Sequence, residues 1–303
     1  MAYFLMIVCV VTCMIQTPFK KLYRDKTAKG TFLFSALIQF VAALFFVGAC
    51  VYGGKFGYAW GVLPYSLLFA FATSMCCICG VLALRYGPLA LTALFASYSQ
   101  MLPTLYGFVW LKEKIFVTQL FGIAFLIVSL YLTNMGRKRE DGETEAASKK
   151  KWNFKKWLPI AIVMAVTNGM CGIIQTEQQR AFGDTYKSEF MVVALAVACT
   201  VLLVVGLLNE RSDIRTVVKL GAVPAVLTGV ANGAANLLVL IVVPVIGASV
   251  FFPVISGGGM VLSYIVSVTL FKERFTTMQK IGILFGVASL VLLNLKFGLI
   301  GSL

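Results

Sequence analysis

The sequence predicts an all-α integral membrane protein with ten transmembrane helices in two inverted five-helix repeats. Three observations predict it: an apolar composition, apolar stretches of helical length, and one stretch that occurs twice. Of the 303 residues, 60% are hydrophobic and 13% charged, whereas soluble domains carry about 45–50% apolar and about 25% charged residues. Transmembrane β-barrels are excluded, because their strands alternate apolar and polar residues in segments of about 10.

Several apolar stretches reach the roughly 20 residues that a helix needs to cross about 30 Å of hydrocarbon. The polar stretch 136–156 is the only long linker, and it separates a first repeat at 1–135 from a second at 157–303. Because five is an odd number, the second repeat must enter the membrane in the opposite sense, as in many secondary transporters. The ten predicted helices cover residues 2–17, 31–52, 62–84, 88–111, 116–135, 157–176, 190–208, 220–243, 247–271 and 277–295.

The duplicated stretch is Trp110–Asn134, which matches Leu270–Asn294 at 10 of 25 positions without a gap. Identical Leu and Ile residues carry little weight, because apolar segments resemble one another by composition. The polar matches carry more, and they predict an internal repeat. They are Lys112-Glu113 with Lys272-Glu273, Gln119 with Gln279, and Asn134 with Asn294.

The distribution of positive charge predicts the orientation. The formal net charge of +14 comes from 26 Lys and Arg residues, and the predicted topology puts 20 of them, Lys20 included, on one side. By the positive-inside tendency that side is cytoplasmic. Both termini are then expected outside, in the cytoplasmic (inner) membrane if the protein is prokaryotic. The charge therefore belongs to membrane loops, and no nucleic-acid partner is expected.

The eight cysteines lie nearly all in apolar runs, where they fit as small buried side chains. Cys76, Cys77 and Cys79 raise the alternative of a soft-metal site, but the chain has no His and no second Cys cluster. We expect no metal and no cofactor. Met1–Thr17 lacks a basic start and a small-residue cleavage site, so we expect it to be kept as a spanning helix.

Neutral polar residues lie at mid-depth in the predicted helices. Unpaired polar groups cost several kcal/mol in hydrocarbon, so these side chains either bond between helices or line a wet cavity. Because the set comes from both repeats, it favours a substrate cavity between them. The predicted substrate-binding residues are Gln16, Ser97, Tyr98, Gln100, Asn168, Gln175, Asn232, Asn236 and Ser256.

Two prolines, Pro103 and Pro253, fall inside predicted spans and should kink them. We interpret them as parts of an outer gate beside the polar residues. Gly229 and Gly233 fit the small-xxx-small packing pattern of membrane helices.

Proton coupling and catalysis both lack their usual residues. Lys280 is the only charged residue inside a predicted span, and Glu177 and Glu189 at helix ends are either coupling candidates or ordinary interfacial charges. No nucleophile stands beside a base and no phosphate-binding loop occurs. We therefore expect no enzyme.

With Lys112-Glu113 and Lys272-Glu273 closing the fourth helix of each repeat, and Gln-x-x-Gly following at Gln119 and Gln279, the chain resembles the EamA-type ten-helix transporters of the drug/metabolite transporter superfamily. That resemblance covers nearly the whole chain. It implies a cavity formed by the inner helices of both repeats, and cargo such as amino acids, drugs, sugars or nucleotide sugars. The usual member has cytoplasmic termini, unlike the arrangement that the charges favour here.

Together these features predict a secondary transporter that works by alternating access. Its expected cargo is a small neutral, zwitterionic or cationic metabolite or drug, because no buried Arg or Lys is evident for a phosphate. The alternative is a flippase or binding scaffold for a lipid-linked intermediate. Expected partners are the small-molecule substrate and the lipid bilayer, with the protein a monomer or a homodimer.

Overall fold

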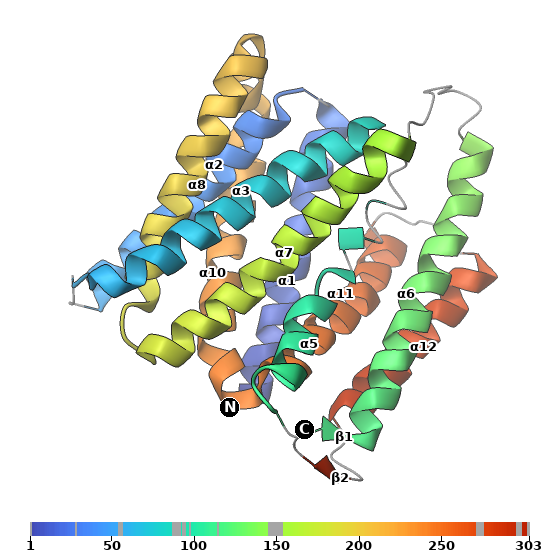
Figure 1. Ribbon diagram of the computed structural model, residues 1–303. Helices are drawn as coiled ribbons and strands as arrows, with labels where there is room; N and C mark the ends of the chain where they lie inside the picture. The colour runs from blue at the N-terminus through green and yellow to red at the C-terminus, as the bar shows by residue number, and fades with distance from the viewer. Residues whose placement is uncertain are drawn as a thin grey trace. The chain divides into compact units, whose positions relative to one another are not determined.

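The computed structural model describes residues 2–27, 29–53, 57–86, 92, 95–96, 98–113, 115–144, 154–270, 276–294 and 299–301. Nearly all of them are helical (Figure 1). The longer helices are α1 (Ala2–Lys26), α2 (Thr31–Tyr52), α3 (Leu63–Tyr86), α5 (Met101–Val109), α6 (Val117–Thr144), α7 (Phe154–Phe182), α8 (Lys187–Asn209), α10 (Ala222–Ile246), α11 (Ala248–Leu270) and α12 (Thr277–Asn294). Short turns at Trp60–Val62, Arg211–Asp213, Ile214–Thr216 (α9) and Val217–Gly221 complete them, with a strand pair, β1 (Ile115–Phe116) and β2 (Leu299–Gly301).

The observed helices follow the predicted ranges, with extensions beyond the apolar segments. α1 continues through Pro18 to Lys26, and α6 continues to Thr144, into the predicted linker at 136–156. The end of an apolar run marks where a helix leaves the hydrocarbon layer, but the helix itself can continue into water. The predicted ends at 17 and 135 were therefore wrong as helix ends.

The predicted fourth helix, 88–111, is not continuous. Ser99 and Gln100 form a turn, and α5 starts at Met101. Pro103 therefore lies in the first turn of α5, where a helical N–H has no partner within the helix. The prediction that Pro103 kinks the interior of a helix was therefore wrong. Pro253 does lie inside its helix, α11.

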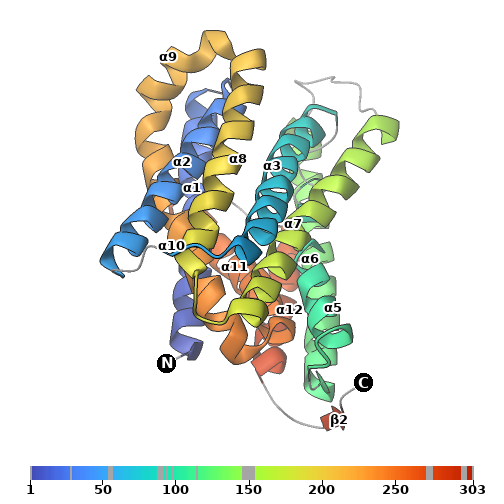
Figure 2. The same ribbon diagram turned by 60° about the vertical axis from the view of Figure 1, so that its left-hand side comes forward.

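The chain forms two compact units, and each takes segments from both halves of the sequence. Unit 1 comprises residues 1–81 and 170–245, and unit 2 comprises 82–169 and 246–303. In unit 1, α2 and α8 lie side by side (Figure 2). Their close approach uses Gly206, where a Cβ atom would lie 2.7 Å from Leu33 Cδ2.

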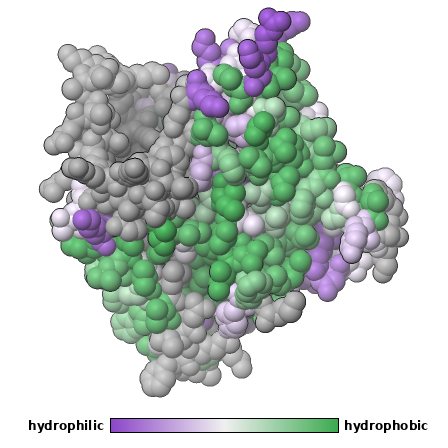
Figure 3. Space-filling view, turned by 180° about the vertical axis from the view of Figure 1, so that it is seen from behind, coloured by the Kyte–Doolittle hydropathy of each residue, from purple (hydrophilic) through white to green (hydrophobic). Residues whose placement is uncertain are grey.

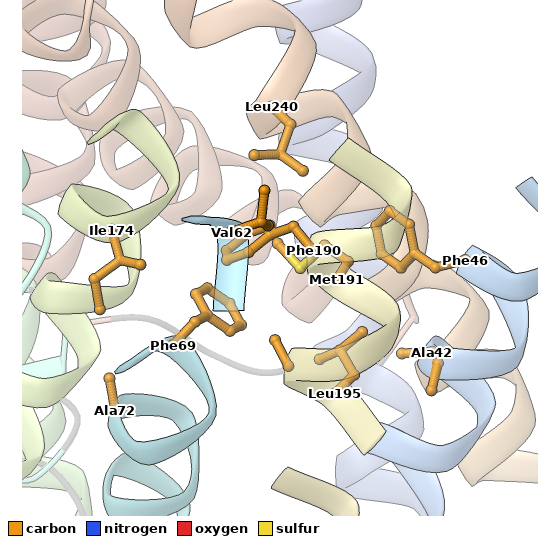
Figure 4. Close-up of a cluster of buried hydrophobic side chains, with 12 residues drawn as sticks. Ala42, Phe46, Val62, Phe69, Ala72, Ile174, Phe190, Met191, Leu195 and Leu240 are labelled. Atoms are coloured by element: carbon orange, nitrogen blue, oxygen red, sulfur yellow. The ribbon is translucent and has the colours of Figure 1, made fainter. Parts of the chain in front are cut away.

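An apolar core of unit 1 lies between α2, α3, α7, α8 and α10 (Figure 4). Phe46, Phe190, Met191 and Leu195 are buried there, and the rings of Phe69 and Phe190 meet edge to face at 5.6 Å. Such dense packing fixes the polar side chains that the same helices carry.

In unit 2, α6 and α12 pack against each other, and they run antiparallel (Figure 1). The hydroxyl of Ser129 donates to the carbonyl of Gly282, whereas Gly122, two turns earlier, lies against Leu293. Residue numbers therefore rise along α6 as they fall along α12, which is the mark of an antiparallel pair.

Six helices in the described part of the chain are long and apolar enough to cross a membrane: Ala2–Lys20, Thr31–Tyr52, Trp60–Ala83, Phe154–Phe182, Lys187–Asn209 and Arg211–Ile246. Large apolar side chains on them are exposed, such as Phe71 at 60% and Val223 at 70%. Hydrophobic residues dominate the coloured surface in Figure 3, and hydrophilic ones gather at its upper edge and at its left and right edges. A surface of this kind suits lipid better than water, so these helices indicate an integral membrane protein.

Candidate functional site

A chain of amide side chains runs through unit 1. Gln175 on α7 donates from Nε2 to Asn236 Oδ1 at 2.8 Å. Asn236 on α10 donates from Nδ2 to the carbonyl of Asn232 at 2.8 Å and to Asn232 Oδ1 at 3.2 Å. Asn232 Nδ2 in turn lies 3.4 Å from Gln39 Oε1 on α2. We call Gln39, Gln175, Asn232 and Asn236 the amide network.

The sequence of α10 positions this network. Asn232 and Asn236 are four residues apart, so they share one face of the helix. Gly229 and Gly233 allow α10 to approach α2, because a Cβ atom there would lie 2.9 Å from the carbonyl oxygen of Ile38 and 2.7 Å from the Phe45 ring, respectively. The small-xxx-small pair thus packs α10 on α2 and brings Asn232 to Gln39.

Gln39 is a member that the sequence analysis missed. It is the one amide in an otherwise apolar span, Thr31–Tyr52, and it is 6% exposed. An isolated amide in a span is a signal for a polar contact between helices. Gln39 could have been found on that ground.

Helix α1 adds Gln16 and a cation to unit 1. Its Cys9 lies against α10, with Sγ 3.8 Å from the carbonyl of Ala235. Cys13, Gln16 and Lys20 follow on the same face of α1, each three or four residues after the one before. Lys20 Nζ lies 3.4 Å from Gln16 Oε1. The prediction that Lys20 belongs to a loop was therefore wrong.

The predicted binding residues divide between the two units. Gln16, Gln175, Asn232 and Asn236 belong to unit 1, while Tyr98, Gln100, Asn168 and Ser256 belong to unit 2. Ser97 lies outside the described residues. In unit 1 the structure joins Gln175, Asn232 and Asn236 directly.

In unit 2, Asn168 on α7 donates to Ser99 Oγ at 2.6 Å. A Cβ atom at the neighbouring Gly169 would lie 2.6 Å from the carbonyl oxygen of Ser99, so the glycine lets α7 reach the turn before α5. Tyr98 bonds instead to the carbonyl of Ile127 on α6, at 3.4 Å. No hydrogen bond joins the described side chains of Gln100 and Ser256 to this pair.

Two glutamates cap helices, a role that the sequence analysis did not predict for either of them. Glu210 accepts hydrogen bonds from the backbone N–H groups of Thr31, Phe32 and Leu33, at 3.1, 2.8 and 3.2 Å, where α2 begins. Glu113 does the same for Ala248 and Ser249, both at 2.9 Å, where α11 begins. A carboxylate at a helix N-terminus satisfies free N–H groups and opposes the positive end of the helix dipole.

Both capped helices follow a glycine with positive φ, Gly30 at 66° and Gly247 at 94°. A Cβ atom at Gly247 would also lie 2.9 Å from Glu113 Oε2. The Lys112-Glu113 pair of the duplicated stretch therefore has a structural role, since its glutamate joins the first half of the chain to α11. Its counterpart, Lys272-Glu273, lies outside the described residues.

Near the Glu210 cap, Tyr23 stacks on Phe34 with ring centroids 4.0 Å apart and donates its hydroxyl to the carbonyl of Lys29 at 2.7 Å. Burial, together with the carboxylates of Glu210 and Asp213, raises the pKa of Tyr23 to about 12. The end of α1 is thereby attached to the start of α2.

Within the described residues, no group of three or more Cys, Asp or Glu side chains could hold a metal ion. Cys171 instead pairs with the Thr73 hydroxyl at 3.4 Å. The site is thus a set of neutral amides, thiols and one ammonium among apolar helices, suited to binding by hydrogen bonds and charge.

No family model matches the chain, and no curated protein matches it. Among solved structures, 27 chains match. One, described only as "Crystal structure of protein", has a TM-score of 0.70 and 15% sequence identity, over 97% of this chain and 98% of that chain. At that identity the likeness shows a shared fold alone.

Proposed function

We propose that the protein is a secondary transporter that carries a small water-soluble molecule across the membrane by alternating access. Its ten spans would form two inverted five-helix repeats, as in EamA-type members of the drug/metabolite transporter superfamily. The cargo would bind at the amide network of unit 1. Gln39 comes from the first half of the chain and Gln175, Asn232 and Asn236 from the second, so this site lies between segments of the two repeats.

The observation that carries the proposal is the hydrogen-bonded chain from Gln175 to Gln39. Each amide offers two N–H donors and an oxygen with two acceptor positions, more than the bonds of the network use. Groups left unsatisfied in an apolar surrounding cost free energy. Water or a polar cargo supplies the remaining partners.

Contacts between α6 and α12 support the inverted repeat. Gln119 accepts from the N–H of Phe116 at 3.2 Å, and Gln279 accepts from the N–H of Thr276 at 2.8 Å. Gln119 and Gln279 are 160 positions apart, and so are Phe116 and Thr276. The two copies therefore start their last helix with the same cap. Their antiparallel packing is what two oppositely inserted copies require.

The test uses purified protein in lipid nanodiscs. A panel of metabolites is screened for compounds that raise the melting temperature, because a ligand that binds only the folded state stabilises it. Uptake of each hit is then measured in proteoliposomes. The Asn232→Leu variant should lose binding and uptake while keeping its helical circular dichroism.

Asn209→Leu is the matched control, because Asn209 is an exposed amide at the end of α8 whose side chain, among the described residues, bonds only to the carbonyl of Val205. It should behave as the unmodified protein. Full uptake by Asn232→Leu would remove the amide network as the site. Stabilisation by polyprenyl phosphates alone, with no soluble hit, would replace the proposal by the flippase.

A further inference from the structure

Helix α10 carries a proline close to its end. Pro244 lies inside the helix, and a proline has no N–H to donate to the carbonyl four residues earlier. That carbonyl belongs to Leu240, which is 0% exposed and packs in the apolar core shown in Figure 4. A buried carbonyl without a partner costs free energy, so the Leu240 carbonyl requires a donor from another part of the chain.

Gln179 on α7 supplies that donor. Two carbonyl oxygens face the same end of its side-chain amide, that of Leu240 at 3.0 Å and that of Gly183 at 3.1 Å, so this end is the nitrogen with its two N–H groups. Gly183 ends α7: its φ is 58°, and its N–H donates to the carbonyl of Gln179 at 2.8 Å. One NH2 group therefore joins the end of α7 to the proline segment of α10.

This contact lies one turn after a contact of the amide network, on the same two helices. Gln175 donates to Asn236, and Gln179 donates to Leu240. Asn236 and Leu240 each lie 61 positions after their partner, so α7 and α10 run parallel here and advance together by one turn. All four residues belong to unit 1. The register that brings Asn236 to Gln175 is therefore the register that Gln179 holds.

Gln178 fixes the orientation of the Gln179 amide. Its own amide contacts the oxygen of that amide, and the two residues are 0% and 5% exposed. The remaining polar atom of Gln178 has no partner among the described residues, and a buried polar atom without a partner costs free energy. Apolar residues of the same shape at both positions would avoid that cost. Stability alone does not account for the two amides, whereas a role in positioning does.

We propose that Gln179 is a positioning residue of the amide network. By holding the carbonyl that Pro244 leaves free, it keeps α10 on α7 at the level where Asn236 meets Gln175. Without this bond α10 shifts against α7, and the network loses its geometry although none of its members has changed. That the network binds a cargo rests on the proposed function; its positioning by Gln179 does not.

The test removes the donor and then restores the helical bond. Gln179→Met keeps the length of the side chain without an N–H, and Pro244→Ala returns an N–H that can bond to Leu240 within α10. Hydrogen–deuterium exchange of the full chain in nanodiscs is followed in peptides that cover residues 237–246. Exchange there should be about tenfold faster in Gln179→Met, as expected for one lost buried hydrogen bond. In the double variant it should match that of Pro244→Ala alone.

A second measurement reports on the network itself. Solid-state NMR of proteoliposomes containing protein with isotope-labelled asparagine gives the side-chain carbonyl signal of Asn236, which is assigned by its loss in Asn236→Ala. The signal should shift in Gln179→Met and return in the double variant with Pro244→Ala. An N–H inside α10 cannot replace a side chain that only fills space, so this rescue separates positioning from packing.

Two matched variants serve as controls. Gln175→Met removes an amide of the same helix whose partner is a side chain, so Pro244→Ala should not suppress its effect on exchange. Pro224→Ala changes a proline near the other end of α10, roughly 30 Å away at a rise of about 1.5 Å per residue. It should leave the effect of Gln179→Met unchanged.

Several outcomes overturn the proposal. They are an unchanged exchange rate or an unchanged Asn236 signal in folded Gln179→Met, exchange that stays fast in the double variant, and an equal rescue by Pro224→Ala. If Gln179→Met gives no folded protein, Pro244→Ala should recover it, and a failure to do so also overturns the proposal. No measurement uses a cargo, so loss of the proposed function and loss of the positioning role are distinguishable.

Discussion

Phe125 stacks on Phe285, with ring centroids 5.2 Å apart and ring planes 27° from parallel. The two residues are 160 positions apart and occupy the same place in the two copies of the duplicated stretch. The pairs around them follow the same relation: Ser129 bonds to Gly282, the counterpart of Gly122. Equivalent residues of the two copies therefore meet across one antiparallel helix contact.

This contact depends on Gly122, which gives the first prediction. A Cβ atom at this position would lie 2.9 Å from Leu293 Cγ and 3.0 Å from the Leu293 backbone nitrogen. Because the backbone cannot move aside without shifting α12, Gly122→Ala should destabilise the protein by about 1–3 kcal/mol. Thermal unfolding in detergent measures the change.

Gly48→Ala is the control. Gly48 lies inside α2, and a Cβ atom added there would have no neighbouring atom within 4 Å. Alanine in a helix interior is favoured over glycine by about 0.5–1 kcal/mol. We expect the melting temperature of this variant to stay or to rise. Equal effects of the two substitutions would contradict the close packing of α6 on α12.

Most of the helix positions could be predicted, because they depend on residue type along the chain. The range 31–52 agrees with α2 to the residue, and Gly229 and Gly233 were correctly interpreted as packing glycines. The turn at Ser99 could not be predicted, since it depends on α7, whose Asn168 supplies the partner of Ser99.

In the site, Asn232 and Asn236 could be paired from their spacing of four, but their partners could not, because the contacts cross between helices far apart in sequence. Lys20 was assigned to a loop because the predicted first helix ended at residue 17. Its alignment with Cys9, Cys13 and Gln16 was the available signal. The sequence gives no comparable signal for Glu210, because acidic residues are common in the loops that follow membrane spans.

The second prediction concerns the Glu210 cap of α2. Glu210→Gln removes the negative charge and leaves one acceptor oxygen for three N–H groups. We expect a loss of about 1–2 kcal/mol in the free energy of unfolding, the usual range for losing a good helix cap. Chemical unfolding followed by circular dichroism gives the value.

Asp184→Asn is matched in chemistry, but the Asp184 side chain is 92% exposed and, in the described part of the chain, pairs only with Lys187. Surface changes of this kind alter stability by less than about 0.5 kcal/mol. A Glu210→Gln variant as stable as Asp184→Asn would show that the three N–H groups find other partners.

A double-mutant cycle on Gln175 and Asn236 is the third prediction. Each change to Leu leaves the other amide without its 2.8 Å partner, so the second change should cost less than the first. Hydrogen bonds between membrane helices give coupling energies of about 0.6 kcal/mol on average and up to about 1.7. We expect about 0.5–1.5 kcal/mol here, measured by unfolding of the two single variants and the double variant. Gln175 with the remote Asn209 serves as the reference cycle, and it should be additive within about 0.5 kcal/mol.

The fourth prediction follows from the raised pKa of Tyr23. A folded-state pKa of about 12, against an ordinary value of about 10, means that folding favours the neutral phenol. The stabilisation is complete below about pH 10 and is lost as the pH rises through about 12. At pH 8, Tyr23→Phe should be less stable by about 0.5–1.5 kcal/mol, since it loses the hydrogen bond to Lys29. Between pH 10 and 12 the melting temperature of the unmodified protein should fall faster than that of Tyr23→Phe. Parallel curves would show that Tyr23 titrates normally.

The last prediction tests the opposed insertion of the two copies. Lys112 and Lys272 are equivalent residues of the duplicated stretch, each two positions after the offset-matched Trp110 and Leu270. If the repeats are inverted, these lysines lie on opposite faces of the membrane. Lys112→Cys and Lys272→Cys, made in a chain whose eight cysteines are replaced by alanine, are treated in intact cells with a membrane-impermeant maleimide. Lys112→Cys should react and Lys272→Cys should react only after the membrane is opened, because the positive-inside tendency puts the basic loop around Lys272 in the cytoplasm.

A cysteine at Lys138, in the basic region between the halves, provides the cytoplasmic reference. Reaction of both variants in intact cells, or of neither, would place the two copies in the same sense and exclude alternating access between inverted repeats.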